Sequence, residues 1–290
     1  MNRFAIAISI LFAALPPVNA QLLWQISGNS VESKSYLLAT DMLTDAAFFD
    51  SIPNVFRLFN SANNIITEMT YTDSLLQKAI LQNALLPDSL TLKKLYSNKE
   101  YNEIRQAVEQ YLQIPITQIE RLKPVYINEL IRQQLLRRWA GYQSDRSSDN
   151  FFQSLCQQTN KTLTGLDNTG ETIYMLFERE PIEWQKAELL RIVRNPEKEI
   201  KQQKTISTFY VNGKLNEIAY QVSMPDNQTS ISYSDYKTYC ERNREWVKKL
   251  NPYLKQGGQF IVLNCIYLGG DDGLISQLRK AGYKVKPVNR

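Results

Sequence analysis

The sequence predicts an α/β fold, with a central mixed β-sheet, flanking helices and a mainly helical insertion in the middle of the chain. The first part alternates short apolar runs with one helical pattern, and the last part contains an apolar run, a helical pattern and a final short run. Between residue 73 and about residue 160, apolar residues recur at helical spacing and strand-like runs are missing. Strands at both ends of the chain therefore predict one sheet, with the insertion added to it.

The elements before the insertion follow from short apolar runs separated by turn residues. The first two runs lie on either side of a segment containing Gly28 and Asn29, which is typical of a β-hairpin. The third run is apolar and ends at an acid, which predicts a buried strand. The expected elements are strands 22–26 and 35–40, a helix over 50–62 that Asp50 or Ser51 caps, and a strand over 64–69.

The remaining elements are mostly helical until the last third of the chain. The closing strand, helix and strand favour parallel pairing of the two strands with a right-handed crossover. The expected helices cover 74–85, 98–112, 124–139, 149–159, segments within 169–194, 197–211, 215–222, 234–250 and 273–281, and the expected strands cover 161–166, 259–264 and 283–288.

The first twenty residues have the pattern of a secretory signal peptide. Arg3 precedes an apolar run over 4–15, and a small-residue site ends at Ala20. No cysteine follows Ala20, which argues against a lipid anchor, and no apolar run is long enough to span a bilayer. We therefore expect a secreted, periplasmic protein whose mature domain covers 21–290 and which has no transmembrane segment.

The composition excludes several classes of function. The chain has no histidine, so the commonest neutral-pH acid/base and metal ligand is absent. Its net charge of +5 comes from 34 basic and 29 acidic residues, which is not typical of a nucleic-acid-binding protein. Three cysteines exclude a disulfide-built fold but leave one bridge possible. No glycine-rich phosphate loop is present, and we expect no cofactor.

Polar residues at strand ends lead to a family resemblance. Glu68 ends one apolar run, Asp167 follows another in the segment KTLTGLDNTGETIY, and Arg242 lies in YCERNREWVKKL. Together with LLWQISGNS, SYLLATDML, NNIITEMTY and FIVLNCIYLGGDDGLISQLRKAGYKVKPV, in this order, these segments resemble the TraB/GumN family, also called TraB, PrgY and GumN. The resemblance extends from residue 22 to residue 288.

The resemblance implies an α/β fold shared with ChaN and erythromycin-esterase-like proteins, and a relationship to the Tiki group of metalloproteases. It also implies an active site with two Gly-x-x-His motifs. At the first motif this chain has Ala39 and Met42, and at the second it has Asn264 and Tyr267. Both glycines and both histidines are replaced. Thioether and phenol groups are poor substitutes for imidazole on zinc or manganese, so we expect no metal site of the family type.

Other motif positions are retained. The strand-end acid is Glu68, the Glu-Arg-Asn motif contains Arg242, and the Gly-Leu-Glu position of the family ends in Asp167. Glu68 and Arg242 are expected either to form a buried ion pair that orients the late helix or to take part in a different reaction. Met42 and Tyr267 would then fill the volume left by the histidines. Further candidates for a cleft are Thr40, Asp41, Glu241, Asn243 and Cys265.

Three hypotheses about function follow. The first is a non-catalytic pseudoenzyme that binds a peptide or an envelope component. The second is a metallohydrolase-like or protease-like enzyme with a remodelled site, in which Glu68 or Asp167 acts as general base and Arg242 stabilises an anion. The third is a structural protein that binds a partner protein through its helical insertion.

Overall fold

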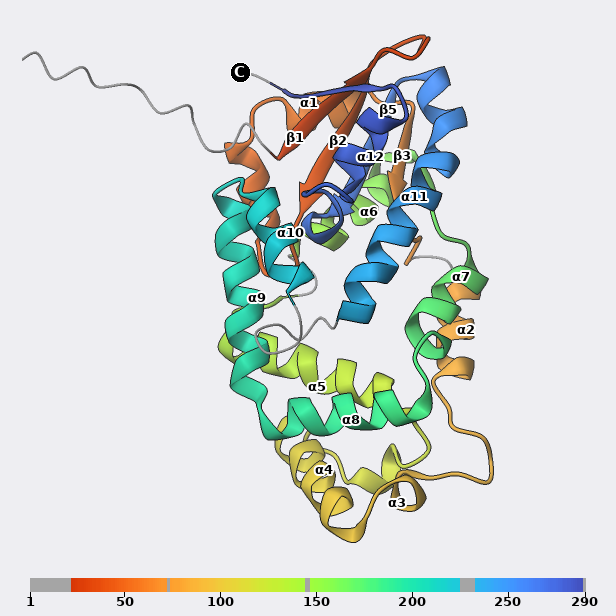
Figure 1. The fold of residues 1–290 in the computed structure, drawn as a ribbon, viewed down its shortest axis with the longest axis vertical. Helices are drawn as coiled ribbons and strands as arrows, with labels where there is room; N and C mark the ends of the chain where they lie inside the picture. The colour runs from red at the N-terminus through yellow and green to blue at the C-terminus, as the bar shows by residue number, and fades with distance from the viewer. Residues whose placement is uncertain (1–21, 72–73, 144–146, 225–232, 289–290) are drawn as a thin grey trace, which may run out of the picture.

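The fold is built on one six-stranded mixed sheet, which confirms the predicted α/β class (Figure 1). The computed structural model describes residues 22–71, 74–143, 147–224 and 233–288, so the predicted signal peptide lies outside the described residues. The strand order is β4-β3-β5-β2-β1-β6. The strands are β1 (Leu23–Ser27), β2 (Ser35–Thr40), β3 (Asn64–Thr67), β4 (Thr162–Gly165), β5 (Gln259–Asn264) and β6 (Lys284–Pro287).

The strand directions confirm the hairpin and correct one prediction. β1 and β2 pair antiparallel, as predicted, and β2, β5, β3 and β4 are parallel to one another. The last strand, β6, does not pair with β5 but antiparallel with β1, so that Val285 lies opposite Ile26. The reason is that β2 and β3 already occupy both sides of β5. The chain therefore crosses to the free edge of β1.

Most predicted helices are present, with local differences. The helices are α1 (Val55–Ser61), α2 (Ser74–Asn83), α3 (Leu92–Leu95), α4 (Asn98–Tyr111), α5 (Pro124–Trp139), α6 (Ser148–Thr159), α7 (Thr169–Ile173), α8 (Ile182–Arg194), α9 (Pro196–Val211), α10 (Leu215–Ser223), α11 (Tyr233–Gln256) and α12 (Leu274–Lys280). A π-helical turn, η4 (Tyr174–Glu178), follows α7. Pro181 then stands at the N-cap of α8, where its ring disfavours helical geometry in the residue before it.

The predicted caps of the first helix are wrong. The segment Ala46–Ser51 forms a 3-10 turn, η2, and the Asp45 side chain caps it by accepting a hydrogen bond from the Ala47 backbone. The α-helix begins only at Val55, after Asn54 with a φ of 71°. Asp50 and Ser51 therefore belong to the end of the preceding turn and cap no helix.

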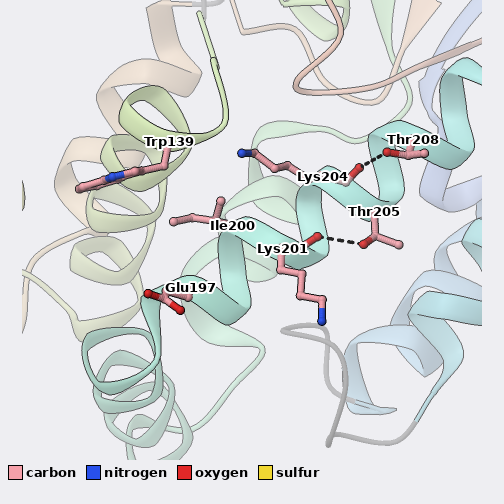
Figure 2. A pocket seen from close by; sticks show the side chains of 7 residues that line it. All are labelled: Trp139, Glu197, Ile200, Lys201, Lys204, Thr205 and Thr208. Atoms are coloured by element: carbon pink, nitrogen blue, oxygen red, sulfur yellow. Dashed lines mark hydrogen bonds between the residues drawn. The ribbon is translucent and has the colours of Figure 1, made fainter.

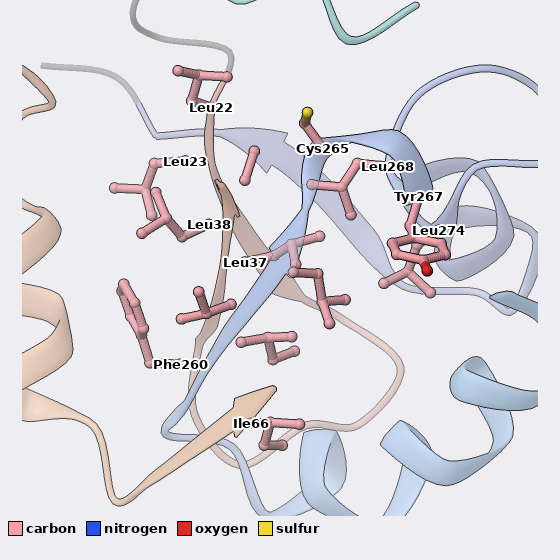
Figure 3. Close-up of a cluster of buried hydrophobic side chains, with 14 of the residues drawn as sticks. Leu22, Leu23, Leu37, Leu38, Ile66, Phe260, Cys265, Tyr267, Leu268 and Leu274 are labelled. Carbon is pink, nitrogen blue, oxygen red and sulfur yellow. The ribbon is translucent and has the colours of Figure 1, made fainter. Parts of the chain in front are cut away.

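The main hydrophobic core covers both faces of the sheet. Figure 3 shows part of it, where side chains from β1, β2 and β5 meet those of the segment after β5. On one face, α1 and α6 pack through an aromatic group in which the rings of Phe59, Phe152 and Phe260 lie 5.3–5.9 Å apart. This core fixes the carboxyl ends of the parallel strands, where the candidate residues lie.

A second hydrophobic core lies outside the sheet, in a layer of helices (Figure 1). It joins α4 and α5 with α8, through buried residues such as Ile104, Ile131 and Leu189. This helical layer therefore includes α8, which follows β4 in the chain, whereas α6 contacts β4 and β5. The boundaries of the insertion, 73–160, stay a prediction. None of the described helices is long and apolar enough to cross a membrane.

Candidate functional site

The retained family residues meet at the carboxyl ends of the parallel strands. Glu68 directly follows β3, and Asp167 follows β4 by two residues. Tyr267 ends η5 (Cys265–Tyr267), the 3-10 turn after β5. Because β3 lies between β4 and β5, this order brings the three side chains to the same edge of the sheet. The carboxyl edge of a parallel sheet is the usual location of a binding site in α/β proteins.

Arg242 of α11 connects these three residues. Its Nε donates a hydrogen bond to Asp167 Oδ2 at 2.7 Å, and its Nη1 donates to Glu68 Oε2 at 3.3 Å. The same Nη1 also donates to the Tyr267 hydroxyl. The Arg242 side chain is only 9% exposed. The predicted Glu68–Arg242 ion pair is therefore present, and Asp167 and Tyr267 extend it into a cluster of four residues, which we call the Arg242 cluster.

Aromatic rings cover the guanidinium of Arg242. Its central carbon lies 4.3 Å from the ring centroid of Trp246 and 5.1 Å from that of Tyr267. Trp246 is fully buried and donates a hydrogen bond from Nε1 to Asp167 Oδ1 at 2.6 Å. A planar, delocalised cation suits such stacking and forked hydrogen bonding. Trp246 had no predicted role, although its position one helical turn after Arg242 was the available signal.

The two carboxylates of the cluster have their hydrogen bonds within the protein. Glu68 Oε1 accepts from the backbone N–H of Asn264 at 3.2 Å, and its other oxygen accepts from Arg242. Both Asp167 oxygens also accept hydrogen bonds, and Lys249 lies 3.6 Å from Asp167 Oδ1. Burial raises the pKa of Glu68 above its usual value, although Arg242 and the Asn264 N–H oppose this shift. Burial likewise raises the pKa of Tyr267 well above its usual value.

These residues do not fit a divalent metal of the kind that the family resemblance implies. Within the described ranges, no group of three or more Cys, Asp or Glu side chains is arranged to hold a metal ion. The Arg242 cluster supplies two carboxylates and a phenol, and the guanidinium already binds all three. A cation at the centre of such a donor set would repel a metal cation.

Asp41 directly follows β2, but its hydrogen bonds are with residues outside the Arg242 cluster. Its Oδ2 accepts hydrogen bonds from the hydroxyls of Thr44 and Ser207, at 2.8 and 2.7 Å. The Ser148 hydroxyl donates to its backbone carbonyl at 2.7 Å. Burial raises the pKa of Asp41, while the hydroxyls of Ser207 and Thr44 oppose the shift. Asp41 therefore connects the end of β2 to α6 and α9.

Ser207→Ala is expected to lower the free energy of unfolding by about 1–2 kcal/mol, because it removes a hydrogen bond to a buried carboxylate. Urea denaturation of the purified variant measures this change. Ser154→Ala is the control, since the exposed Ser154 hydroxyl bonds only to a carbonyl of its own helix, and its unfolding curve should stay close to that of the unchanged protein. Equal losses in both variants would contradict this role of Asp41.

The residues at the position of the first Gly-x-x-His motif, Ala39 to Met42, lie in the core or at its edge. Ala39 and Thr40 are buried in β2, and the Ala39 carbonyl accepts a hydrogen bond from the Tyr210 hydroxyl at 2.9 Å. Met42 is half-buried, and its sulfur accepts a contact of 3.6 Å from Nη1 of Arg132 in α5. Met42 thus contacts the helical layer, whereas Tyr267 packs against Trp246.

The other candidates differ in their surroundings. Glu241 is exposed, next to the buried side chain of Asn243. The Asn243 amide donates to the carbonyls of Tyr267 and Asp272, at 2.9 and 3.1 Å, and so attaches α11 to the segment after β5. Cys265 is a fully buried thiol beside Leu268 (Figure 3). All three cysteines of the chain are buried, and none of them forms a disulfide with another.

The side chain of Asn264, at the second motif, has a local role. Its Oδ1 accepts a hydrogen bond from the backbone of Ile266 at 3.1 Å and so caps η5. This cap fixes the turn that carries Tyr267. Asn264 and Tyr267, at the second motif, therefore lie at the end of β5, where Tyr267 joins the Arg242 cluster.

Comparison with known proteins identifies the family of this chain. No curated protein and no solved structure matches the chain significantly. The family model described as the TraB/PrgY/gumN family matches residues 22–287. This range contains all six strands and every residue of the Arg242 cluster. The chain belongs to the TraB/PrgY/gumN family.

Proposed function

We propose that this family member is a non-catalytic, exported protein that acts by binding a peptide or an envelope component. The observation that supports it is the Arg242 cluster, in which Glu68, Asp167 and Tyr267 all contact one buried guanidinium. Tyr267 stands where the family has its second histidine. The cluster holds α11 against the ends of β3, β4 and β5 as an internal structural contact.

The chemistry of the cluster supports a structural role. A general base needs a lone pair directed at the substrate, and a metal needs several ligand atoms directed at one point. The oxygens of Glu68 and Asp167 accept hydrogen bonds from Arg242, Trp246 and the backbone of Asn264. Releasing either carboxylate for catalysis would break a buried ion pair, which is costly.

Metal analysis of the natively purified protein tests this proposal. After addition of manganese, zinc or cobalt and removal of free metal, we expect no stoichiometric metal to remain by mass spectrometry. One tightly bound equivalent that Glu68→Gln abolishes would overturn the proposal. Glu241→Gln is the matched control, because it changes the same charge at an exposed position next to Arg242.

A remodelled enzyme is the second candidate, favoured by one observation. Burial raises the pKa of Glu68, which suits a carboxyl group for general acid chemistry closer to neutral pH. In that case Asp167 would orient Arg242, and Arg242 would stabilise an anion. Peptidase or esterase turnover that Glu68→Gln removes and Glu241→Gln retains would establish this candidate. Turnover that persists in Glu68→Gln would exclude Glu68 as its catalytic group.

Export is proposed from the first twenty residues, whose charged start, apolar run and small-residue site are typical of a signal peptide. The intact mass of the protein recovered from the cell envelope or the medium should correspond to a chain that starts at Gln21. A recovered chain that still carries residues 1–20 would contradict this cleavage site.

A further inference from the structure

A surface groove lies away from the Arg242 cluster, between the end of α5 and the outer face of α9 (Figure 2). Its volume is about 460 Å³. The residues that line it include Trp139, Ile200, Lys201, Lys204, Thr205 and Thr208. The α5 side of the groove belongs to the helical layer, and α9 packs against α5.

The groove is lined by two lysines and one glutamate, Glu197, so its lining has a net positive charge. Lys201 and Lys204 are exposed, stand about one helical turn apart, and make no ion pair within the part of the chain that the structure describes. In Figure 2, the Lys204 side chain points across the groove towards Trp139. The Lys201 side chain extends in another direction, so the two ammonium groups offer separate positions for negatively charged groups of a ligand.

The two threonine hydroxyls of the groove wall have internal partners. The hydroxyls of Thr205 and Thr208 donate to the carbonyls of Lys201 and Lys204, at 2.9 and 2.8 Å (Figure 2). These hydroxyls are thus not available as donors to a ligand. The two lysines are the donors that a ligand in the groove would meet.

Trp139 supplies a fixed apolar wall. Trp139 is 46% exposed, yet its ring packs edge-on against the ring of Tyr111. The two ring centroids lie 6.0 Å apart, and the angle between the ring planes is 83°. The Arg138 guanidinium lies 5.9 Å from the ring centroid. An exposed aromatic ring that is held in place binds an apolar group with little loss of conformational entropy.

We propose that this groove binds a short acidic peptide segment in which a large apolar side chain packs against Trp139 and carboxylates pair with Lys201 and Lys204. The proposal deepens the binding role given above and rests on it. The face of α9 that lines the groove extends from Glu197 to Thr208, a length of roughly 16 Å at 1.5 Å per residue. That length matches about five residues of extended peptide.

The charge pattern favours a peptide over a continuous polyanion. Glu197 lines the same groove and would repel a chain that carries a negative charge at every unit, such as a nucleic acid. The groove also lacks a bidentate arginine among its lining residues, which is the usual group for phosphate recognition. A peptide can place its carboxylates at the lysines and a neutral or basic residue at Glu197.

Fluorescence anisotropy of a labelled peptide, acetyl-Gln-Phe-Glu-Leu-Glu-amide, tests the proposal. The first residue of this probe is glutamine, so that no carboxylate need lie at Glu197. The probe should bind the full chain, whereas its counterpart with glutamine for each glutamate should bind at least tenfold more weakly. The double variant Lys201→Gln/Lys204→Gln should weaken peptide binding at least tenfold, because it removes both charge-assisted hydrogen bonds. Lys93→Gln/Lys99→Gln makes the same charge change at exposed lysines outside the groove and should leave the affinity within about twofold.

Further measurements separate the outcomes. Trp139→Phe should retain most of the affinity and Trp139→Ala should lose it, with thermal denaturation confirming that both variants fold. No binding to the full chain, or equal binding by both lysine double variants, would overturn the inference. Displacement of the peptide by equimolar inorganic phosphate or heparin would also overturn it. Stoichiometric metal binding at Glu68 would contradict the non-catalytic function and leave this groove untouched.

Discussion

Arg242→Met is expected to lower the free energy of unfolding by about 3–5 kcal/mol, because it breaks a buried ion pair. The change removes the partner of two carboxylates, those of Glu68 and Asp167, which stay at the buried ends of their strands. It also removes the cation that stacks on Trp246 and Tyr267. Urea denaturation at neutral pH measures the loss.

The same variant should depend on pH in a defined direction. Burial already raises the pKa of Glu68 above its ordinary value of 4.5, and removal of the nearby cation raises it further. Between 4.5 and the raised pKa, the folded chain then binds more protons than the unfolded chain. The stability of Arg242→Met should therefore fall as the pH rises from 4.5, and denaturation at several pH values records this slope.

Two controls make the prediction specific. Arg244→Met removes the same charge at an exposed position of α11, and its free energy of unfolding should change by less than about 0.5 kcal/mol. Adding Glu68→Gln to Arg242→Met removes one of the unpaired charges and should recover part of the loss. Equal losses in Arg242→Met and Arg244→Met would show that the cluster does not stabilise the fold.

Gly269→Ala is expected to lower the free energy of unfolding by about 3 kcal/mol, through a steric clash. A Cβ at this position would lie 2.0 Å from the Leu215 carbonyl oxygen and 2.4 Å from its carbon. These are backbone atoms of α10, so no side-chain rotation relieves the clash. The segment after β5 would have to move away from α10, and thermal denaturation should show the loss.

Gly170→Ala is the matched control for this substitution. At Gly170, in α7, an added Cβ would lie 3.3 Å from Oδ1 of Asn168, the N-cap of this helix, and a shift of a few tenths of an ångström relieves that contact. Alanine also favours a helix more than glycine does, so the stability should change by less than about 1 kcal/mol. A similar loss in both variants would mean that the close approach of α10 to Gly269 is not required for stability.

Much of the fold follows from local patterns in the chain. The helices at 98–111, 124–139 and 196–211 agree with the predicted helices to within one residue at each end, because their apolar spacing has the helical period. The edge position of β6 did not follow, because strand neighbours depend on which edges of the sheet are free. The break before α8 within 169–194 could have been predicted from Pro181.

The candidate site was predictable in part. Glu68, Asp167 and Arg242 were identified from strand ends and family motifs, and the structure brings them together with Tyr267. Asp41 was grouped with them, but its carboxylate contacts Ser207 and Thr44 instead. The groove beside Trp139 joins side chains of α5 and α9, which are distant in sequence, so no local pattern indicated it.

The sequence by itself determined the α/β class, the order of most elements and the absence of histidine, since periodicity and residue identity are properties of short segments. Only the tertiary structure decided what the retained residues contact. Arg242 lies 75 residues from Asp167 and 174 residues from Glu68 along the chain, and their charges interact because the parallel strands end side by side. Electrostatic contact depends on distance in space, and packing of the sheet and helices sets that distance.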